Sequence, residues 1–240
     1  MIALNDINLS KIDLSGIDLR GIKLGLGGRG GSGDDSQRPW LFPDHAWTVT
    51  GKTNEDSNRD IIANVTGNGN DLKLTNFGFA EGSGYNQEGE YAGYLITDGV
   101  DDKVVSSDFL MDKEFTIVGE WKLVADEMGS AGIVKPSSLF VFNKDNGLII
   151  YINNTNKGQI LNTKSLKAIC SDGRVYYDDW SEMLVSEEQP IASSNKYLMI
   201  GSNGNHFTKI ALKNLAIYNH ILSKDDCIKA YDYLQTLKAK

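Results

Sequence analysis

Three features of the sequence predict an all-β protein, folded as a two-sheet antiparallel β-sandwich with a short C-terminal helix. From residue 47 onward, short runs rich in β-branched and aromatic residues alternate with clusters of Gly, Asn, Asp and Ser, as expected of strands joined by turns. One pair of runs flanks a turn-forming pentapeptide, which indicates a hairpin. Only the last stretch has a helical pattern. Many short strands followed by one terminal helix are typical of a sandwich.

The predicted strands follow one another at short intervals. They occupy residues 71–79, 91–96, 103–105, 115–123, 138–142, 147–152, 166–170, 174–177, 197–201 and 208–218. Phe140 and Phe142 precede the turn 143–147, and Ile149 and Tyr151 follow it. We therefore expect these two strands to pair as a hairpin.

One helix is predicted near the C-terminal end, over residues 223–237. Ser223 is a favourable N-cap, and the acidic residues at 225 and 226 suit the positive end of the helix dipole. Ile228, Tyr231 and Leu234 recur at helical spacing and would share one face.

Composition and charge narrow the class of protein. The chain has 240 residues and is 40% hydrophobic, which is enough for one sizeable core. Its net charge of −8 argues against binding to nucleic acid or to an anionic membrane. No run approaches the roughly 18 apolar residues of a membrane span, and residues 1–10 lack the pattern of a signal peptide. We expect synthesis in the cytoplasm, without membrane insertion.

The two cysteines, Cys170 and Cys227, lie far apart in the sequence. Two cysteines make no disulfide framework, so we expect two free thiols that do not hold the fold together. The expectation is one buried and one half-exposed thiol.

The first segment, residues 1–24, repeats every five residues. Its apolar positions are Ile7, Leu9, Ile12, Leu14, Ile17, Leu19, Ile22 and Leu24. This spacing fits neither a helix nor a long strand, and it is similar to pentapeptide-repeat proteins. Four pentads cannot bury their own apolar faces, because repeat units need about three stacked neighbours. We therefore predict an attachment and oligomerisation segment, and its partner would be a symmetry mate, another protein or the sandwich itself.

A glycine-rich linker is predicted over residues 25–46. Its GLGGRGGSG run has no preceding apolar strand, no following helix and no Lys-Ser/Thr pair, so it does not fit a phosphate-binding loop. The predicted organisation is an attachment segment at 1–24, a linker at 25–46 and a sandwich at 47–240.

Three passages resemble the concanavalin A-like (laminin-G-like) superfamily. LITDGVDDKV at 95–104 is similar to its strand-turn-strand passage, FTIVGEW at 115–121 to its long central strand, and KNLAIYNHILSKDD at 213–226 to its closing strand and helix start. The resemblance implies a concanavalin A-like (jelly-roll) β-sandwich with an extended N-terminal attachment segment. This fold hosts lectins, adhesins, glycanases and structural modules, so it implies no single function.

A fourth passage suggests a biological setting. Residues 51–71 resemble sandwich proteins encoded by gut Bacteroidota and their phages. Together with the repetitive tip and the missing signal peptide, this resemblance implies a virion surface protein, a head or tail fibre or a capsid decoration. By analogy with such proteins, a homotrimer that attaches to other virion proteins is the expected assembly.

Two loops are candidate carbohydrate-binding sites, because sugars stack on aromatic faces while carboxylates and amides take their hydroxyls. The first loop contains Tyr176, Tyr177, Asp178 and Trp180, and the second contains Asn203, Asn205 and His206. The alternative for the first loop is that Tyr176 and Trp180 pack inward as part of the core. The partners would be cell-surface glycans.

A cluster of acidic residues, Asp98, Asp101 and Asp102, is a candidate calcium site. Calcium prefers oxygen ligands from carboxylates and loop carbonyls. The same residue types are also common in ordinary turns, and both interpretations are open. No other cofactor is indicated.

The sequence lacks the marks of an enzyme. Glycanases of this fold carry a Glu-x-Asp-x-(x)-Glu motif on one strand, which supplies a nucleophile and an acid, and no such spacing occurs. His45, His206 and His220 show no zinc spacing. We predict a non-enzymatic virion surface protein that binds host or environmental glycans. The alternatives are a purely structural capsid or tail component and a glycan hydrolase.

Overall fold

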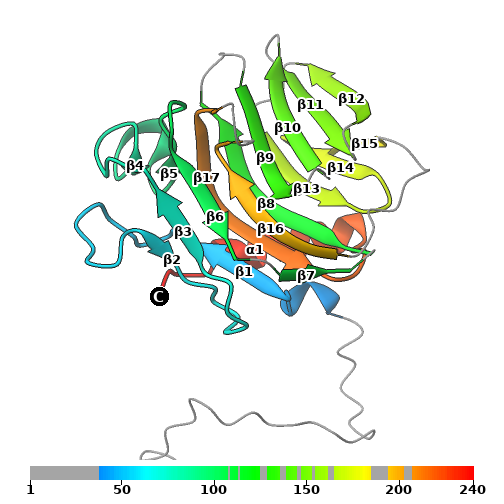
Figure 1. Ribbon diagram of the computed structural model, residues 1–240. Helices are drawn as coiled ribbons and strands as arrows, with labels where there is room; N and C mark the ends of the chain where they lie inside the picture. The colour runs from blue at the N-terminus through cyan, green and yellow to red at the C-terminus, as the bar shows by residue number, and fades with distance from the viewer. Residues whose placement is uncertain are drawn as a thin grey trace, which may run out of the picture. The chain divides into compact units, whose positions relative to one another are not determined.

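The computed structural model describes residues 38–107, 109–112, 114–124, 129–135, 139–144, 147–152, 155–161, 165–184, 194–202 and 207–240. These residues form the predicted two-sheet antiparallel sandwich with one C-terminal α-helix (Figure 1). The attachment segment, with its eight predicted assembly residues, lies outside the described residues.

One sheet has eight strands in the order β15-β14-β13-β8-β17-β5-β4, with β1 paired to β17. Its strands are β1 (His45–Thr48), β4 (Gly84–Tyr85), β5 (Leu95–Ile96), β8 (Thr116–Leu123), β13 (Ser165–Cys170), β14 (Arg174–Tyr177), β15 (Ser181–Leu184) and β17 (Ile210–Tyr218). The long strands β8 and β17 pair over almost their whole length and form the centre of this sheet.

The second sheet has nine strands in the order β12-β11-β10-β9-β16-β6-β3-β2, with β7 paired to β16. Its strands are β2 (Ile61–Ile62), β3 (Leu72–Thr75), β6 (Lys103–Ser106), β7 (Phe109–Met111), β9 (Gly129–Lys135), β10 (Leu139–Lys144), β11 (Gly147–Ile152), β12 (Thr155–Leu161) and β16 (Ser194–Ile200). The elements η4 (Pro39–Leu41) and η5 (Gly89–Tyr91) are short 3-10 helices.

Each of the ten predicted strands overlaps an observed strand. The predicted hairpin is confirmed, because β10 and β11 place Phe140 opposite Tyr151 and Phe142 opposite Ile149. The sequence pattern missed β1, β2, β4, β7, β9, β12 and β15. Several of these, such as GSAGIVK in β9 and TNKGQIL in β12, contain few strand-favouring residues and depend on the partner strand.

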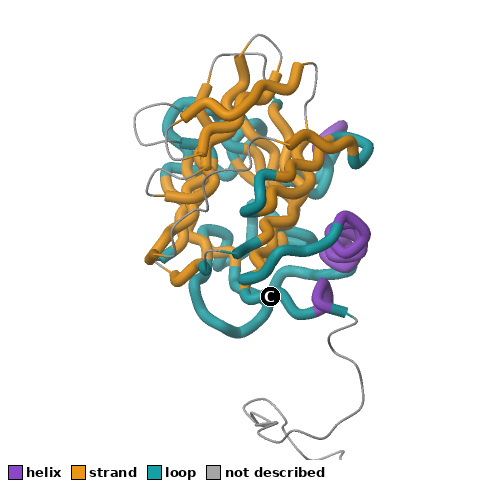
Figure 2. The backbone as a smooth tube through the Cα atoms, turned by 90° about the vertical axis from the view of Figure 1, so that its right-hand side faces the viewer, coloured by secondary structure: helices purple, strands orange, loops and turns teal. Residues whose placement is uncertain are grey.

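The main core fills the space between the sheets. Strand β8 shows the alternation that builds it: Ile117 and Trp121 face the inter-sheet core, whereas Val118 faces the outer side. On that outer side a second apolar cluster joins the eight-stranded sheet to the helix α1 (Lys224–Gln235). Figure 2 shows α1 beside the strands, nearly end-on and next to η4. No helix among the described residues is long and apolar enough to cross a membrane.

The buried face of α1 differs from the predicted one. Cys227, Ala230 and Leu234 are buried, whereas Ile228 and Tyr231 are half-buried. Small Cys and Ala side chains let the helix axis approach the sheet closely. For this reason the helix turns the face with Cys227 and Ala230 to the sheet, and not the predicted face. The predicted N-cap is confirmed, because the Ser223 hydroxyl accepts a hydrogen bond from the Asp226 amide at 3.1 Å.

The prediction of one half-exposed thiol was wrong. Cys170 is 1% exposed and Cys227 is fully buried. Cys170 ends β13 on the outer side of the sheet, and the first turn of α1 covers it with Cys227. Both residues therefore serve as small apolar side chains at the contact between helix and sheet.

Candidate functional site

Two of the aromatic residues predicted to bind sugar, Tyr176 and Tyr177, lie on opposite faces of β14, and Trp180 lies in the turn that follows. Tyr176 is fully buried in the cluster under α1, and Tyr177 packs against the inter-sheet core. Trp180 is half-buried, with its ring edge-on to Tyr231 at 5.6 Å and tilted against Tyr176 at 6.1 Å. Tyr176 is therefore unavailable as a stacking surface, in agreement with the inward-packing alternative.

The turn between β14 and β15 is strained. Asp178 has φ 40° and Trp180 has φ 69°, a left-handed conformation that a bulky side chain rarely adopts. The Asp178 carboxylate accepts hydrogen bonds from the amide and the hydroxyl of Ser165, at 3.2 and 2.8 Å, which fixes the turn to β13. The second predicted loop, with Asn203, Asn205 and His206, lies outside the described residues.

The three aspartates of the acidic loop lie close together, and the carboxylates of Asp98 and Asp102 hold the turn. The Oδ1 atom of Asp98 accepts hydrogen bonds from the amides of Val100, Asp101 and Asp102 at 2.8 to 3.3 Å. The Oδ2 atom of Asp102 accepts from the Ser83 hydroxyl at 2.7 Å and from the Asp98 amide at 2.9 Å. One oxygen of each aspartate lies within 4.8 Å of the others, so a calcium ion also fits this donor set.

Asp102 is the unusual member of the loop. It is fully buried, and its Oδ1 atom has no hydrogen-bond partner among the residues that the structure describes. Burial raises the pKa of Asp102, and hydrogen bonds from Ser83 and Asp98 oppose that shift. If calcium binds, it would be held by the Oδ1 atom of Asp102 and by the carboxylates of Asp98 and Asp101. The bound ion would keep Asp102 ionised.

We predict that Asp98→Ala lowers the free energy of unfolding by about 1–3 kcal/mol, because three amides lose their acceptor. Urea unfolding in EDTA and in calcium measures the loss, and Asp101→Ala, at an exposed position, is the control. The turn interpretation requires the same loss in both solutions. A loss that grows in calcium, with Asp101→Ala also impaired, would establish the metal site instead.

A hollow of about 450 Å³ opens between the η4–β1 segment, the 65–68 loop and the C-terminal end of α1. Its apolar side is formed by Phe42, Pro43, Tyr233 and Leu237. Phe42 is 60% exposed, which is unusual for a phenylalanine. Asn68 and Lys238 supply an amide and an ammonium group at the same hollow.

The backbone on both sides of Phe42 is fixed, so its exposure does not arise from a loose end. The carbonyl of Trp40 accepts a hydrogen bond from the Tyr218 hydroxyl at 2.7 Å, and the Trp40 ring lies edge-on to Tyr233. The Asp44 backbone amide donates to a carbonyl of β17 at 2.9 Å, and the Asp44 carbonyl accepts from the side-chain amide of Asn68 at 2.7 Å. The backbone that carries Phe42 is therefore held in place, and its exposed side chain lines the hollow.

Sequence reasoning missed this hollow because residues 38–46 fall within the predicted linker. The described sandwich begins earlier, since η4 starts at Pro39 and β1 at His45. The available signal was the PWLFP run, in which two aromatic residues stand between two prolines that restrict the backbone.

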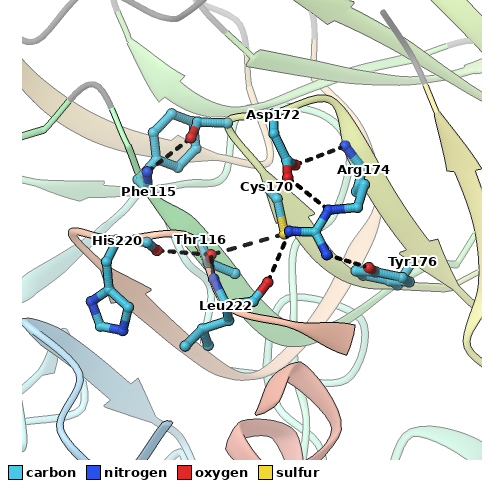
Figure 3. Close-up of polar contacts among 9 residues, drawn as sticks. Phe115, Thr116, Cys170, Asp172, Arg174, Tyr176, His220 and Leu222 are labelled. Carbon is cyan, nitrogen blue, oxygen red and sulfur yellow. Dashed lines mark hydrogen bonds and ion pairs between the residues drawn. The ribbon is translucent and has the colours of Figure 1, made fainter. Parts of the chain in front are cut away.

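The two thiols lie in a buried environment that does not suit a nucleophilic centre. In Figure 3, Arg174 donates hydrogen bonds to the Asp172 carboxylate at 2.7 Å, the Tyr176 hydroxyl at 3.1 Å and the Leu222 carbonyl at 3.0 Å. The hydrogen bond with Cys227 lowers the pKa of Cys170; burial opposes this shift and Arg174 adds to it. Both thiols are buried between α1 and the sheet, where a substrate cannot reach them.

Comparisons with known proteins support the fold. No protein-family model matches the sequence, and no curated protein matches it significantly. The chain is similar in structure to Trypanosoma rangeli sialidase in complex with sialic acid, at 13% identity and a TM-score of 0.52, over 80% of this chain and 32% of that one. It is also similar to a structure of botulinum neurotoxin type C, whose cell entry depends on interaction with two ganglioside molecules. The identity is 12% and the TM-score is 0.54, and the match covers 84% of this chain and 53% of that one.

A third similar structure is the binding domain of botulinum neurotoxin serotype D/C, at 11% identity and a TM-score of 0.53, covering 82% of this chain and 53% of that one. The chain thus spans about a third of the sialidase and about half of the toxin chains. At these identities the likeness shows the fold, a β-sandwich that also occurs in these proteins, and leaves the function to be argued from the site.

Proposed function

We propose that the sandwich is a non-enzymatic glycan-binding domain, and that the hollow beside Phe42 is its sugar site. The observation that carries this proposal is a fixed, 60% exposed phenylalanine at a hollow of about 450 Å³. That volume lies in the range of small-ligand sites, which combine aromatic walls with a few polar groups. Phe42 would stack on the C–H face of a sugar, while Asn68 and Lys238 would bind its hydroxyls.

Two of the structurally similar proteins support this proposal. The sialidase structure is a complex with sialic acid, and cell entry of the type C toxin depends on interaction with two ganglioside molecules. Both are sugar ligands, although neither likeness assigns a site to this chain.

Replacing Phe42 with alanine is expected to weaken glycan binding by up to about tenfold, since an aromatic contact contributes about 0.5–1.5 kcal/mol. Ligands are first selected on a glycan array, and affinities are then measured by calorimetry. Val100→Ala is the matched control, because Val100 is 71% exposed and lies in the acidic loop, outside the hollow. Equal binding by Phe42→Ala and the unchanged protein would refute the hollow as the site. Failure to bind any glycan would favour a purely structural role, and release of reducing sugar would favour the hydrolase alternative.

We further propose that the protein is displayed on a phage virion and attached through residues 1–24. The support is the series of eight Ile and Leu residues, which need a partner surface, and the resemblance of residues 51–71. Mass spectrometry of purified particles is expected to detect the chain, and light scattering is expected to show a trimer that becomes a monomer when residues 1–33 are removed. A full-length monomer that is also missing from particles would contradict the attachment role.

A further inference from the structure

A second constellation of polar and aromatic side chains lies on the outer face of the eight-stranded sheet. It contains Tyr94, Glu120, Lys122, Lys167, Lys213 and Tyr231, which we call the lysine face. Tyr231 and the hollow residue Tyr233 are two positions apart on α1, so they point to opposite sides of the helix. The lysine face is therefore distinct from the hollow.

Irregularities in the strand register aim the lysines at Glu120. On one side of β8, the pairing with β13 shifts between Leu166 and Ala168, and Lys167 lies at the shift. On the other side, the pairing with β17 shifts between Leu212 and Asn214, and Lys213 lies at the shift. Such bulges turn side chains in a new direction and are common beside functional sites. Three adjacent strands thus depart from regular pairing at the same level of the sheet.

Glu120 is the centre of the cluster and is 9% exposed. Its Oε1 atom accepts a hydrogen bond from the Tyr94 hydroxyl, and Lys122 and Lys213 each approach a carboxylate oxygen at 3.8 Å. Burial alone would raise the pKa of Glu120, but the hydrogen bond from Tyr94 and the charge of Lys213 outweigh burial and lower it. Glu120 is therefore an ionised carboxylate.

The lysines hold more positive charge than Glu120 neutralises. A strong ammonium–carboxylate hydrogen bond is about 2.7–2.9 Å long, so at 3.8 Å Lys122 and Lys213 keep N–H donors for another acceptor. Both ammonium groups lie over the Tyr94 ring, at 4.8 and 5.7 Å from its centroid. Their side chains are 34% and 27% exposed, so a ligand can reach them.

Lys167 shows the effect of this crowding. Its ammonium group donates to the Tyr231 hydroxyl at 2.8 Å and lies 4.0 Å from the centre of that ring. Burial lowers the pKa of Lys167, and repulsion from Lys122 lowers it further, against the attraction of Glu120 and the weaker influence of Asp178 and Asp232. Three ammonium groups therefore face one buried carboxylate in a chain whose net charge is −8.

Half-buried aromatic rings lie at both ends of the cluster. Tyr91 packs edge-on against Tyr94 near β5, and Trp180 packs edge-on against Tyr231 beyond β14. Because β5 and β14 lie on opposite sides of β8 in the sheet, the rings flank the ammonium groups. A cationic centre between aromatic edges suits a ligand that combines a negative group with the C–H surface of a ring.

We propose that the lysine face binds an acidic sugar, with the ammonium groups of Lys122 and Lys213 taking its carboxylate. Glu120 is a positioning residue that holds the lysines and does not contact the sugar. This assignment rests on the proposed function, that the sandwich binds glycans, and adds the class of sugar and a second site.

The test measures sugar binding to the full chain by calorimetry. It compares 3′-sialyllactose with lactose and glucuronic acid with glucose, and 3′-sulfolactose tests a sulfate in place of the carboxylate. We expect each carboxylated sugar to bind at least tenfold more tightly than its neutral counterpart, with a preference that weakens as salt is added. Lys122→Gln with Lys213→Gln should reduce the preference to less than twofold, and the corresponding double arginine variant should keep it. The control is Lys73→Gln with Lys103→Gln, which makes the same change of charge on the other sheet.

Each outcome has a defined meaning. An unchanged preference in the double glutamine variant, or tight binding of the sulfated sugar alone, would overturn the assignment. If neutral sugars bind Phe42→Ala as well as acidic ones do, the acidic site is wrong while the glycan-binding proposal stands. If no sugar binds at all, both fail. Acidic binding that survives Phe42→Ala would support the lysine face as the separate site.

Discussion

Replacing Gly119 with alanine is expected to destabilise the sandwich by about 2–3 kcal/mol. Gly119 lies in the middle of β8, where its missing side chain leaves room for the Trp121 ring. A Cβ atom at this position would come within 2.3 Å of that ring and 2.7 Å of the Asn214 carbonyl oxygen on β17. The ring is held in the inter-sheet core and the carbonyl belongs to the backbone, so neither yields easily.

Thermal unfolding should show this loss as a melting temperature lowered by roughly 4–12 °C for a domain of this size. Gly78→Ala is the matched control, because a Cβ atom there meets only Ser83, at an ordinary 3.6 Å, and the backbone is not left-handed. In a Trp121→Leu background, Gly119→Ala should cost less than it does alone but still destabilise, since the contact with the Asn214 carbonyl remains. An alanine variant as stable as the unchanged protein would show that β8 and β17 are less closely paired than the structure indicates.

The parts of the fold that could be predicted from sequence are those with a local cause. The β10–β11 hairpin follows from a turn pentapeptide between alternating apolar residues, and the start of α1 follows from Ser223 as its N-cap. Strands such as β9 could not be found in this way, because pairing with β10 and β16 stabilises them more than their own residues do.

The candidate sites show the same limit more strongly. The Asp98 loop is contiguous in sequence and was found from it, whereas Lys122, Lys167 and Lys213 lie on three different strands. Only the strand order and the register shifts bring these lysines together. Tyr176 failed as a sugar-stacking residue for a related reason, since the position of α1 over the sheet cannot be read from β14 alone.

Replacing Arg174 with methionine is expected to expose the buried thiols by loosening the start of α1. The Arg174 guanidinium ties β14 to the Leu222 carbonyl, one residue before the N-cap Ser223, and also supports the Tyr176 hydroxyl (Figure 3). Methionine preserves much of the side-chain volume but donates no hydrogen bond. The loss of these charge-assisted bonds should lower the free energy of local opening by about 1–2 kcal/mol, which corresponds to roughly 5- to 30-fold more of the open state.

The measurement is the rate at which a thiol reagent labels the folded protein, because Cys170 and Cys227 react only when α1 leaves the sheet. Labelling should accelerate roughly 5- to 30-fold in Arg174→Met when opening is in rapid equilibrium. Arg59→Met is the control: Arg59 lies over the Phe79 ring and donates to the Asn54 carbonyl, in a loop remote in sequence from both thiols. Labelling of Arg174→Met at the unchanged rate, with the control also unchanged, would mean that apolar packing by Ala230 and Leu234 alone holds the helix down.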